Sequence, residues 1–288
     1  MIRDGVAAAL AAALGSPVAS AVPVAGGSIN RAARVTLGDG RPVFVKHSRD
    51  APAGAFAAEA AGLAWIAAAG AVSTPAVLAV GDHADPPFLA LEWIDRDPRA
   101  GGRGEEFGRA LAALHAAGAA TFGAAAENWI GPLPQPNAPA ATWAEFYGAR
   151  RLAPLARRAI DCGLLPASFA AAIERLRARL PQLAGPPEPP ARLHGDLWSG
   201  NAMLDAATGP VVIDPAAYGG HREIDLAMMR LFGGFPAAAF AAYAEAAPLA
   251  PGHEERVALW QLYPVLVHVC LFGGGYTRQA QAIVSGYL

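Results

Sequence analysis

The 288-residue chain contains little of several residue types, and each shortage excludes a class of protein. Its two cysteines, Cys162 and Cys270, lie far apart in different apolar surroundings, so we expect no structural disulfide and a reducing, cytoplasmic location. Charged residues make up 16% of the chain and the net charge is −2, so no strong field favours nucleic acid or an anionic membrane as a partner. The chain also lacks an uninterrupted apolar run of about 18 residues, so we expect no membrane-spanning helix.

Lysine is almost absent, because 21 of the 22 basic residues are arginine and only Lys46 is lysine. Lys46 ends the apolar stretch 42–46. An ammonium is a compact point charge, whereas a guanidinium is a wide planar fork. The count alone also allows the alternative that one lysine was retained by chance. The place of Lys46 at the end of a predicted strand, after a glycine-containing loop, favours a function that requires an ammonium.

Hydrophobic residues make up 54% of the chain, which is enough for a sizeable core, and their pattern changes along the sequence. We expect an α+β chain with a small β-rich N-terminal lobe over residues 1–91, a hinge at 92–98, and a larger, mainly helical lobe over 99–288. The expected strands are 22–25, 31–37, 42–46, 76–80 and 88–93, and the expected helices are 1–16, 53–70, 105–117, 142–159, 166–180, 223–232, 236–246, 254–271 and 276–287. Residues 122–140 and 181–190 are expected to be irregular or extended connections.

The alanine-rich start of the chain has two interpretations. A signal peptide would carry a net positive charge before its apolar run, but here Asp4 stands beside Arg3. An amphipathic first helix is therefore the better interpretation.

The segment 192–214 contains the residues most indicative of chemistry. It places Asp196 five residues before Asn201, and a second aspartate, Asp214, ends the apolar run 211–213. One carboxylate can orient a hydroxyl and accept its proton, while an amide oxygen and a second carboxylate can hold Mg²⁺ on a nucleotide triphosphate. This order and spacing are typical of phosphoryl transfer in the protein-kinase-like fold. Each residue alone could be an ordinary turn residue, but the combination is hard to obtain by chance.

The N-terminal part supplies a matching nucleotide site. Gly26 and Gly27, between two predicted strands, can bring main-chain N–H groups close to phosphate oxygens, although such a pair is also common in hairpin turns. Lys46 would contact the phosphates, and Glu59, 13 residues further on in a helix, would hold it by an ion pair. An ordinary exposed helix carboxylate is the alternative for Glu59.

Three further residues near the catalytic segment have less decisive patterns. His194 is expected to hydrogen-bond the loop rather than to act as a base. Asp225 is expected either to cap its helix or to brace the catalytic loop. Trp198 either packs in the core or lines the pocket for the phosphoryl acceptor. The arginines of 150–158 and 175–179 are expected on solvated helix faces.

Taken together, the motifs HGDLWSGN and IDPAAYGGHREIDLAMM resemble the fructosamine/ketosamine 3-kinase family, within the aminoglycoside phosphotransferase-like branch of the kinase fold. GGSINRAARVTLGDGRPVFVK, ENWIGPLPQPN and LYPVLVHVCLFGGGY are also similar, so the resemblance covers roughly residues 22–287. It implies Asp196 as proton acceptor, Asn201 and Asp214 as metal ligands, and a nucleotide site that includes Lys46, Glu59 and the loop with Ser28. It also implies an adenine-contacting hinge at Glu92, Trp93 and Ile94. Some relatives carry cysteine where this chain has Ser28, so no thiol switch is expected in that loop.

The resemblance implies an ATP- and Mg²⁺-dependent phosphorylation of the 3-hydroxyl of a ketosamine, free or on a protein. We expect the protein to be a monomer. A phosphotransferase for an aminoglycoside or choline is the first alternative, although the arginine-rich stretch 140–190 disfavours a polycationic acceptor. A nucleotide-binding pseudokinase is the second, although no catalytic residue is missing.

Overall fold

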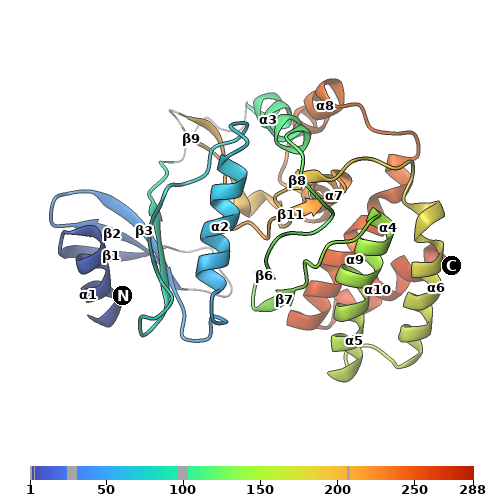
Figure 1. Ribbon diagram of the computed structural model, residues 1–288, viewed down its shortest axis with the longest axis horizontal. Coiled ribbons are helices and arrows are strands. Elements are labelled where there is room, and N and C mark those ends of the chain that lie inside the picture. The colour runs from blue at the N-terminus through green and yellow to red at the C-terminus, as the bar shows by residue number, and fades with distance from the viewer. Residues whose placement is uncertain (1, 3, 25–30, 96–102, 206–207) are drawn as a thin grey trace.

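A computed structural model describes residues 2, 4–24, 31–95, 103–205 and 208–288, and its N-terminal part is an antiparallel sheet with a helix on each face (Figure 1). The sheet has the order β1-β2-β3-β5-β4, with strands β1 (Val18–Val24), β2 (Arg31–Leu37), β3 (Pro42–His47), β4 (Val77–Gly81) and β5 (Phe88–Glu92). The two covering helices are α1 (Asp4–Leu14) and α2 (Ala55–Ala67).

The alternation of side chains along the strands explains why both faces are covered. Val43 and Val45 of β3 join a core cluster with Val6 and Leu10 of α1. Phe44, between them, lies on the opposite face with Phe56 and Leu63 of α2. Successive residues of a strand point to opposite faces, so a strand with apolar residues at both sets of positions needs a cover on each side.

The second part of the chain is mainly helical. Its helices are α3 (Gly104–Ala116), α4 (Trp143–Phe146), the π-helix η2 (Tyr147–Leu152), α5 (Ala153–Asp161), α6 (Ser168–Leu183), α7 (Glu223–Leu231), α8 (Ala237–Ala246), α9 (His253–Phe272) and α10 (Gly275–Gly286). Three two-stranded ribbons accompany them: β6 (Asn128–Ile130) with β7 (Leu133–Gln135), β8 (Ala191–Leu193) with β11 (Tyr218–Gly220), and β9 (Ala202–Asp205) with β10 (Gly209–Val212). In Figure 1 the labelled helices of this part, with β6, β7, β8 and β11, lie to the right of α2, the sheet lies to the left, and β9 lies beside the upper end of α2.

This arrangement confirms the predicted α+β class with a small β-rich part and a larger helical part. The position of the hinge at 92–98 stays a prediction, because its residues 96–98 lie outside the described ranges. Among the helices of the described residues, none combines the length and apolar character that a membrane crossing needs.

Some elements differ from their prediction in extent or in type. Strand β1 begins at Val18, four residues early, because Val18 and residues 20–24 pair with β2 despite the alanine and serine content, with a shift of register between Val18 and Ser20. Residues 122–140 contain the β6–β7 hairpin, and the helix predicted at 142–159 contains the π-helical turn η2. Pro181 lies inside α6, near its end, where the helix loses little because few main-chain hydrogen bonds follow.

Candidate active site

Lys46, Glu59 and Asp214 form one ion-paired group. Lys46 lies two residues after Phe44 in β3, on the face of the sheet that α2 covers, and its Nζ forms an ion pair with an oxygen of Glu59 on that helix. The same ammonium donates a hydrogen bond to Oδ1 of Asp214 at 2.8 Å. The Lys46 side chain is only 5% exposed, whereas that of Asp214 is 46% exposed. The group therefore joins the sheet, helix α2 and the segment after β10, with one carboxylate still open to solvent.

The protonation of this group follows from one cation shared by two carboxylates. Burial opposes the charge on Lys46, but Glu59 and Asp214 together raise its pKa above the ordinary value. Burial raises the pKa of Glu59 above its ordinary value and Asp214 adds to the shift, while the neighbouring Lys46 ammonium opposes it and favours the ionised form. Asp214 is partly shielded from solvent, which opposes its ionisation, yet the charge of Lys46 outweighs this effect and lowers the pKa of Asp214. At neutral pH the site thus holds a charged Lys46 against an ionised Asp214.

The catalytic loop is held in shape by Asp225, a fully buried residue of α7. Its two carboxylate oxygens accept hydrogen bonds from the main-chain N–H groups of His194, at 2.8 Å, and Gly195, at 2.9 Å. His115 Nε2 of α3 lies 3.1 Å from the same carboxylate. Of the two predicted roles for Asp225, the brace of the catalytic loop is therefore the one that the structure shows.

His194 has a structural role, as predicted. Its Nδ1 accepts a hydrogen bond from the main-chain N–H of Asp196 at 3.2 Å, and its Nε2 lies 2.9 Å from the carbonyl oxygen of Ile213. This pattern corresponds to the neutral tautomer with the proton on Nε2. Burial lowers the pKa of His194, which also favours the neutral ring. The ring ties the loop to the strand that leads into Asp214.

Asp196 and Asn201 are in direct contact. The Asn201 amide nitrogen donates to the main-chain oxygen of Asp196 at 2.9 Å and to its carboxylate Oδ2 at 3.2 Å. Burial raises the pKa of Asp196 to about 7, and the neighbouring charge of Asp214 adds to the shift. A carboxylate with a pKa near 7 suits proton transfer at neutral pH.

The β9–β10 hairpin brings Asn201 to Asp214. Ala202 pairs with Val212, and the N–H of Ile213 donates to the carbonyl of Asn201 at 3.0 Å, so Asn201 and Asp214 leave the same end of the hairpin. Because its amide nitrogen is directed at Asp196, the amide oxygen of Asn201 is the atom that a metal would take. One carboxylate and one amide oxygen fit Mg²⁺, which takes few protein ligands and completes its shell with phosphates and water. Among the described residues no cluster of three or more histidines, cysteines or acidic residues forms a metal site, so an ion here would depend on nucleotide oxygens.

The predicted hinge lies at the end of β5. Glu92 uses its side chain locally, since its Oε2 accepts a hydrogen bond from the N–H of Ala76 at 3.1 Å. The indole N–H of Trp93 donates to Asp95 at 2.9 Å, and the Arg34 guanidinium lies 5.1 Å from the Trp93 ring centroid. Ile94 is half-buried. Adenine contacts at these residues would therefore use main-chain atoms.

Of the remaining predicted site residues, the structure describes Trp198 but not the three residues of the phosphate loop. Trp198 is half-buried, with its ring folded against Gly200, where an added Cβ would lie 2.2 Å from the ring. Gly26, Gly27 and Ser28 lie outside the described residues, so the structure does not place the phosphate loop.

Sequence reasoning missed a group of aromatic rings beside the catalytic loop. His268 of α9 lies 4.9 Å, centroid to centroid, from both Phe232 and Tyr276, and 5.5 Å from Phe272. Phe232 and Phe272 are 41% and 56% exposed. Gly234, just after Phe232, is so close to Ser199 that a Cβ there would lie 2.4 Å from the serine hydroxyl. The hint in the sequence was the four-residue spacing of His268, Phe272 and Tyr276 around FGGGY, which is a helical spacing.

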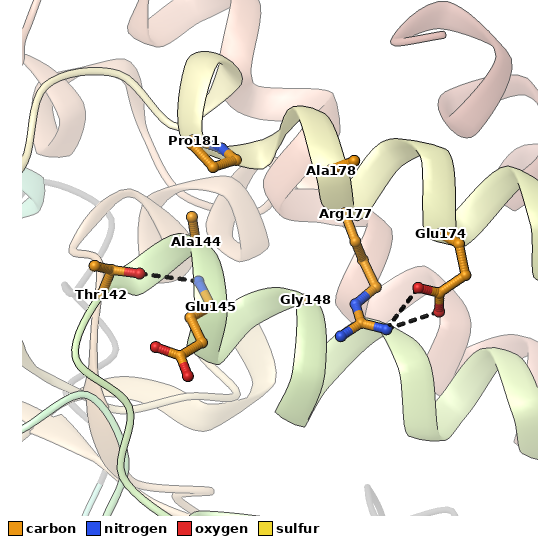
Figure 2. Close-up of a pocket in the computed structure, with 8 residues that line it drawn as sticks. All are labelled: Thr142, Ala144, Glu145, Gly148, Glu174, Arg177, Ala178 and Pro181. Atoms are coloured by element: carbon orange, nitrogen blue, oxygen red, sulfur yellow. Dashed lines mark hydrogen bonds and ion pairs between the residues drawn. The ribbon is translucent and has the colours of Figure 1, made fainter.

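A surface depression between α4 and α6 is separate from this site (Figure 2). Figure 2 shows Arg177 turned toward Glu174 of its own helix, with hydrogen bonds of 2.7 and 2.9 Å, and Thr142 capping α4 through the N–H of Glu145. Its polar groups are thus used within single helices, and none of the predicted site residues lines it.

The sheet with its buried lysine, the carboxylate on the following helix, and the braced loop with Asp196 and Asn201 define an ATP-dependent phosphotransferase of the protein-kinase-like class. The sequence matches the fructosamine kinase family over residues 3–288, and the chain belongs to that family.

Individual relatives agree with this membership. A Synechocystis protein named "probable ketoamine kinase" is 40% identical over 272 residues, which cover 91% of this chain and 88% of the relative. The Arabidopsis thaliana protein-ribulosamine 3-kinase is 35% identical over 268 residues, 92% of this chain and 81% of the relative. The crystal structure of a candidate fructosamine-3-kinase from Thermobifida fusca superposes with a TM-score of 0.89 at 44% identity, covering 99% of both chains. A ternary complex of APH(2")-IIa with ATP and streptomycin has a TM-score of 0.63 at 11% identity, covering 99% of this chain and 97% of the other, which is a likeness of fold alone.

Proposed function

We propose that this protein transfers the γ-phosphoryl group of ATP to the 3-hydroxyl of a ketosamine, the rearranged adduct of a sugar and an amine. The observation that carries the proposal is the convergence of Lys46, Glu59 and Asp214 in one ion-paired group, next to the contacting pair Asp196 and Asn201. These residues come from two parts of the chain, and their order and types match what phosphoryl transfer requires.

Each residue has a role that its surroundings support. Lys46, held charged by its two carboxylates, binds the phosphates of ATP. Mg²⁺ would be held by Asn201 and Asp214, where it supplies positive charge for the phosphate oxygens. Asp196 orients the acceptor hydroxyl and takes its proton, for which a pKa of about 7 is suited. Glu92, Trp93 and Ile94 contact the adenine, and Gly26, Gly27 and Ser28 the phosphates.

The acceptor is placed against Trp198 and the exposed aromatic rings around His268. A ketosamine carries a secondary amine that is protonated at neutral pH, and aromatic faces attract such cations. Burial lowers the pKa of His268, so its ring is neutral and does not repel a cation. The names of the relatives, ketoamine kinase and protein-ribulosamine 3-kinase, support this class of acceptor.

Phosphate next to a ketone makes a labile product, so the phosphorylated adduct can fall apart and release the amine. The proposed role is therefore the repair of glycated amines. We also propose that the protein works as a monomer in the cytoplasm and without nucleic acid, which sedimentation and fractionation can test.

The direct test compares acceptors under identical conditions. ATP turnover is measured with a ribulosamine, a fructosamine, kanamycin and choline, and we expect turnover only with the two ketosamines. Replacement of Trp198 by alanine is expected to raise the KM for the ketosamine about tenfold or more, with the KM for ATP unchanged. Turnover restricted to kanamycin or choline would contradict the ketosamine assignment, and absence of Mg²⁺-dependent ATP binding would contradict the kinase assignment.

A further inference from the structure

A buried polar group contacts the main chain just after Asp214. The Gln135 side-chain amide donates to the carbonyl of Ala216 at 3.0 Å, and the Asn128 amide donates to the carbonyl of Ala217 at 2.9 Å. These carbonyls lie two and three residues beyond the aspartate. Both amides come from the β6–β7 hairpin, which is far from Asp214 in the sequence.

The two amides are themselves fixed from behind. Oδ1 of Asn128 accepts hydrogen bonds from the amides of Gln135 and Asn137, both at 2.7 Å. The hydroxyl of Tyr263, on α9, donates to the other end of the Gln135 amide. Arg151 donates to Oδ1 of Asn137 at 2.8 Å. Because these partners occupy the oxygens of both amides, the amide nitrogens of Asn128 and Gln135 are directed toward residues 216 and 217.

Arg151 is the unexpected member of this group. It was predicted on a solvated helix face, but it is 0% exposed. In the part of the chain that the structure describes, no carboxylate pairs with it, and its guanidinium instead lies 3.9 Å from the Tyr218 ring centroid and 4.6 Å from that of Phe146. Well-packed apolar residues often serve a core as well as, or better than, a buried charge. The buried charge of Arg151 is therefore better explained by the side chains that it holds in position.

The segment that these side chains contact begins with a strained residue. Among the described residues other than glycine, only Asp214 has a positive φ, 53°. Such a conformation persists when the surroundings fix it. Ala216 donates to the carbonyl of His194 at 3.0 Å, and Gly219 exchanges two hydrogen bonds of 2.8 Å with Gly123. Residues 216–219 are thus fixed by the catalytic loop, by Gly123 and by the two amides.

We propose that Asn128 and Gln135, fixed by Arg151, Asn137 and Tyr263, are positioning residues that hold the Asp214 carboxylate in its metal-binding orientation. This inference rests on the proposed function only in that Asp214 binds Mg²⁺. The segment after Asp214 then has one arrangement, with or without nucleotide. Groups that orient a metal ligand typically change metal affinity or activity by about 10- to 100-fold when they are removed.

The test measures how much Mg²⁺ strengthens the binding of a non-hydrolysable ATP analogue, by calorimetry with Mg²⁺ and with EDTA. Asn128→Asp keeps the acceptor for Gln135 and Asn137 but turns an oxygen toward the Ala217 carbonyl. Gln135→Met keeps the size of the side chain and removes its donor. Gln261→Met is the matched control, because it removes the same kind of hydrogen bond, from a glutamine amide to a main-chain carbonyl (Ala227, 3.0 Å), at a residue that belongs neither to this group nor to segment 214–219.

We expect the strengthening by Mg²⁺ to fall about tenfold in the first two variants and to stay within about twofold of the wild type in the control. A wild-type value in Asn128→Asp and Gln135→Met, with a lower melting temperature alone, would show that the group only stabilises the core. No acceptor is needed, so this result is independent of the identity of the substrate. If both variants fail to fold, Tyr263→Phe takes their place, because it removes only the hydroxyl that fixes the Gln135 amide. A fall in the strengthening by Mg²⁺ supports the proposal, and a wild-type value refutes it.

Discussion

Lys46 carries its charge in the protein interior, where an uncompensated charge is strongly destabilising. Its side chain is 5% exposed, and two carboxylates from different parts of the chain compensate its burial. An ammonium can meet both because its three donors are arranged around one small atom, whereas a guanidinium presents a flat fork. This is the physical reason why arginine, used for every other basic residue in the chain, is not found here.

Lys46→Arg is therefore expected to lower kcat/KM by at least about 100-fold, although the charge is conserved. Lys46→Met should give a similar loss, measured under the same conditions. Arg41→Lys, at an exposed ion pair with Asp39, is the control and should leave activity unchanged. Near-normal turnover by Lys46→Arg would mean that only the charge matters.

The burial of the Asp196 carboxyl raises its pKa, which favours proton transfer but lowers the stability of the folded protein at neutral pH. The pKa of about 7 in the folded protein exceeds the ordinary value of 3.8. The folded state therefore binds the proton more tightly than the unfolded state, so the contribution of Asp196 to stability is fully present below about pH 4 and is lost as the pH rises through 7.

Asp196→Asn is expected to reduce turnover by about 1,000-fold and to leave the binding of ATP nearly intact, since the side chain acts on the acceptor. In the wild type, kcat/KM should rise with pH and reach half its maximum near pH 7. Thermal unfolding should show the variant more stable than the wild type at pH 8, by about 2 kcal/mol, and equally stable near pH 4. A flat pH profile or a variant that retains activity would refute the assignment of the base.

At the level of elements, the catalytic loop depends on partners that come from elsewhere in the chain. Asp225 of α7 fixes two of its N–H groups, and the β9–β10 hairpin brings Asn201 beside Asp214. Gly195 has a φ of +84°, and a Cβ there would lie 2.1 Å from the carbonyl oxygen of Ala216. The five strands of the sheet and most helices were predictable from their apolar periods, but the three two-stranded ribbons and these long-range contacts were not.

Gly195→Ala is therefore expected to destabilise the protein by about 3 kcal/mol or more, because the methyl group meets main-chain atoms that cannot move aside. Gly163→Ala has a similar φ of +70° with no atom within 4 Å of the added Cβ, so it should cost only about 1 kcal/mol. Denaturant unfolding of both variants measures the difference. Equal losses would show that the close approach to Ala216 does not constrain the loop.

On the scale of the whole molecule, Lys46 and Asp214 join parts of the chain 168 residues apart. The sheet supplies the cation, and the helical part supplies the carboxylates and amides of the catalytic loop. A nucleotide with Mg²⁺ that binds between them would stabilise both parts at once, because a ligand that binds only the folded state shifts unfolding by mass action.

An ATP analogue at 100 times its dissociation constant is expected to stabilise the protein by about 2.7 kcal/mol. This corresponds to a rise of about 5 °C in the melting temperature of a protein of this size. EDTA should remove most of the rise, and Asp214→Asn should reduce it even with Mg²⁺ present. An increase that does not depend on the metal would argue against Asp214 as a ligand.

The sequence alone determined the fold class, the ion pair of Lys46 with Glu59, the candidate residues Asp196, Asn201 and Asp214, and the family, because each depends on residue types at fixed spacings. Only the tertiary structure decided that Asp225 braces the loop, that Arg151 is buried, and that Asn128 and Gln135 contact the segment after Asp214. The raised pKa of Asp196 is likewise a property that only the tertiary structure reveals. Burial and contacts between distant segments create these properties, and no local pattern of residues records them.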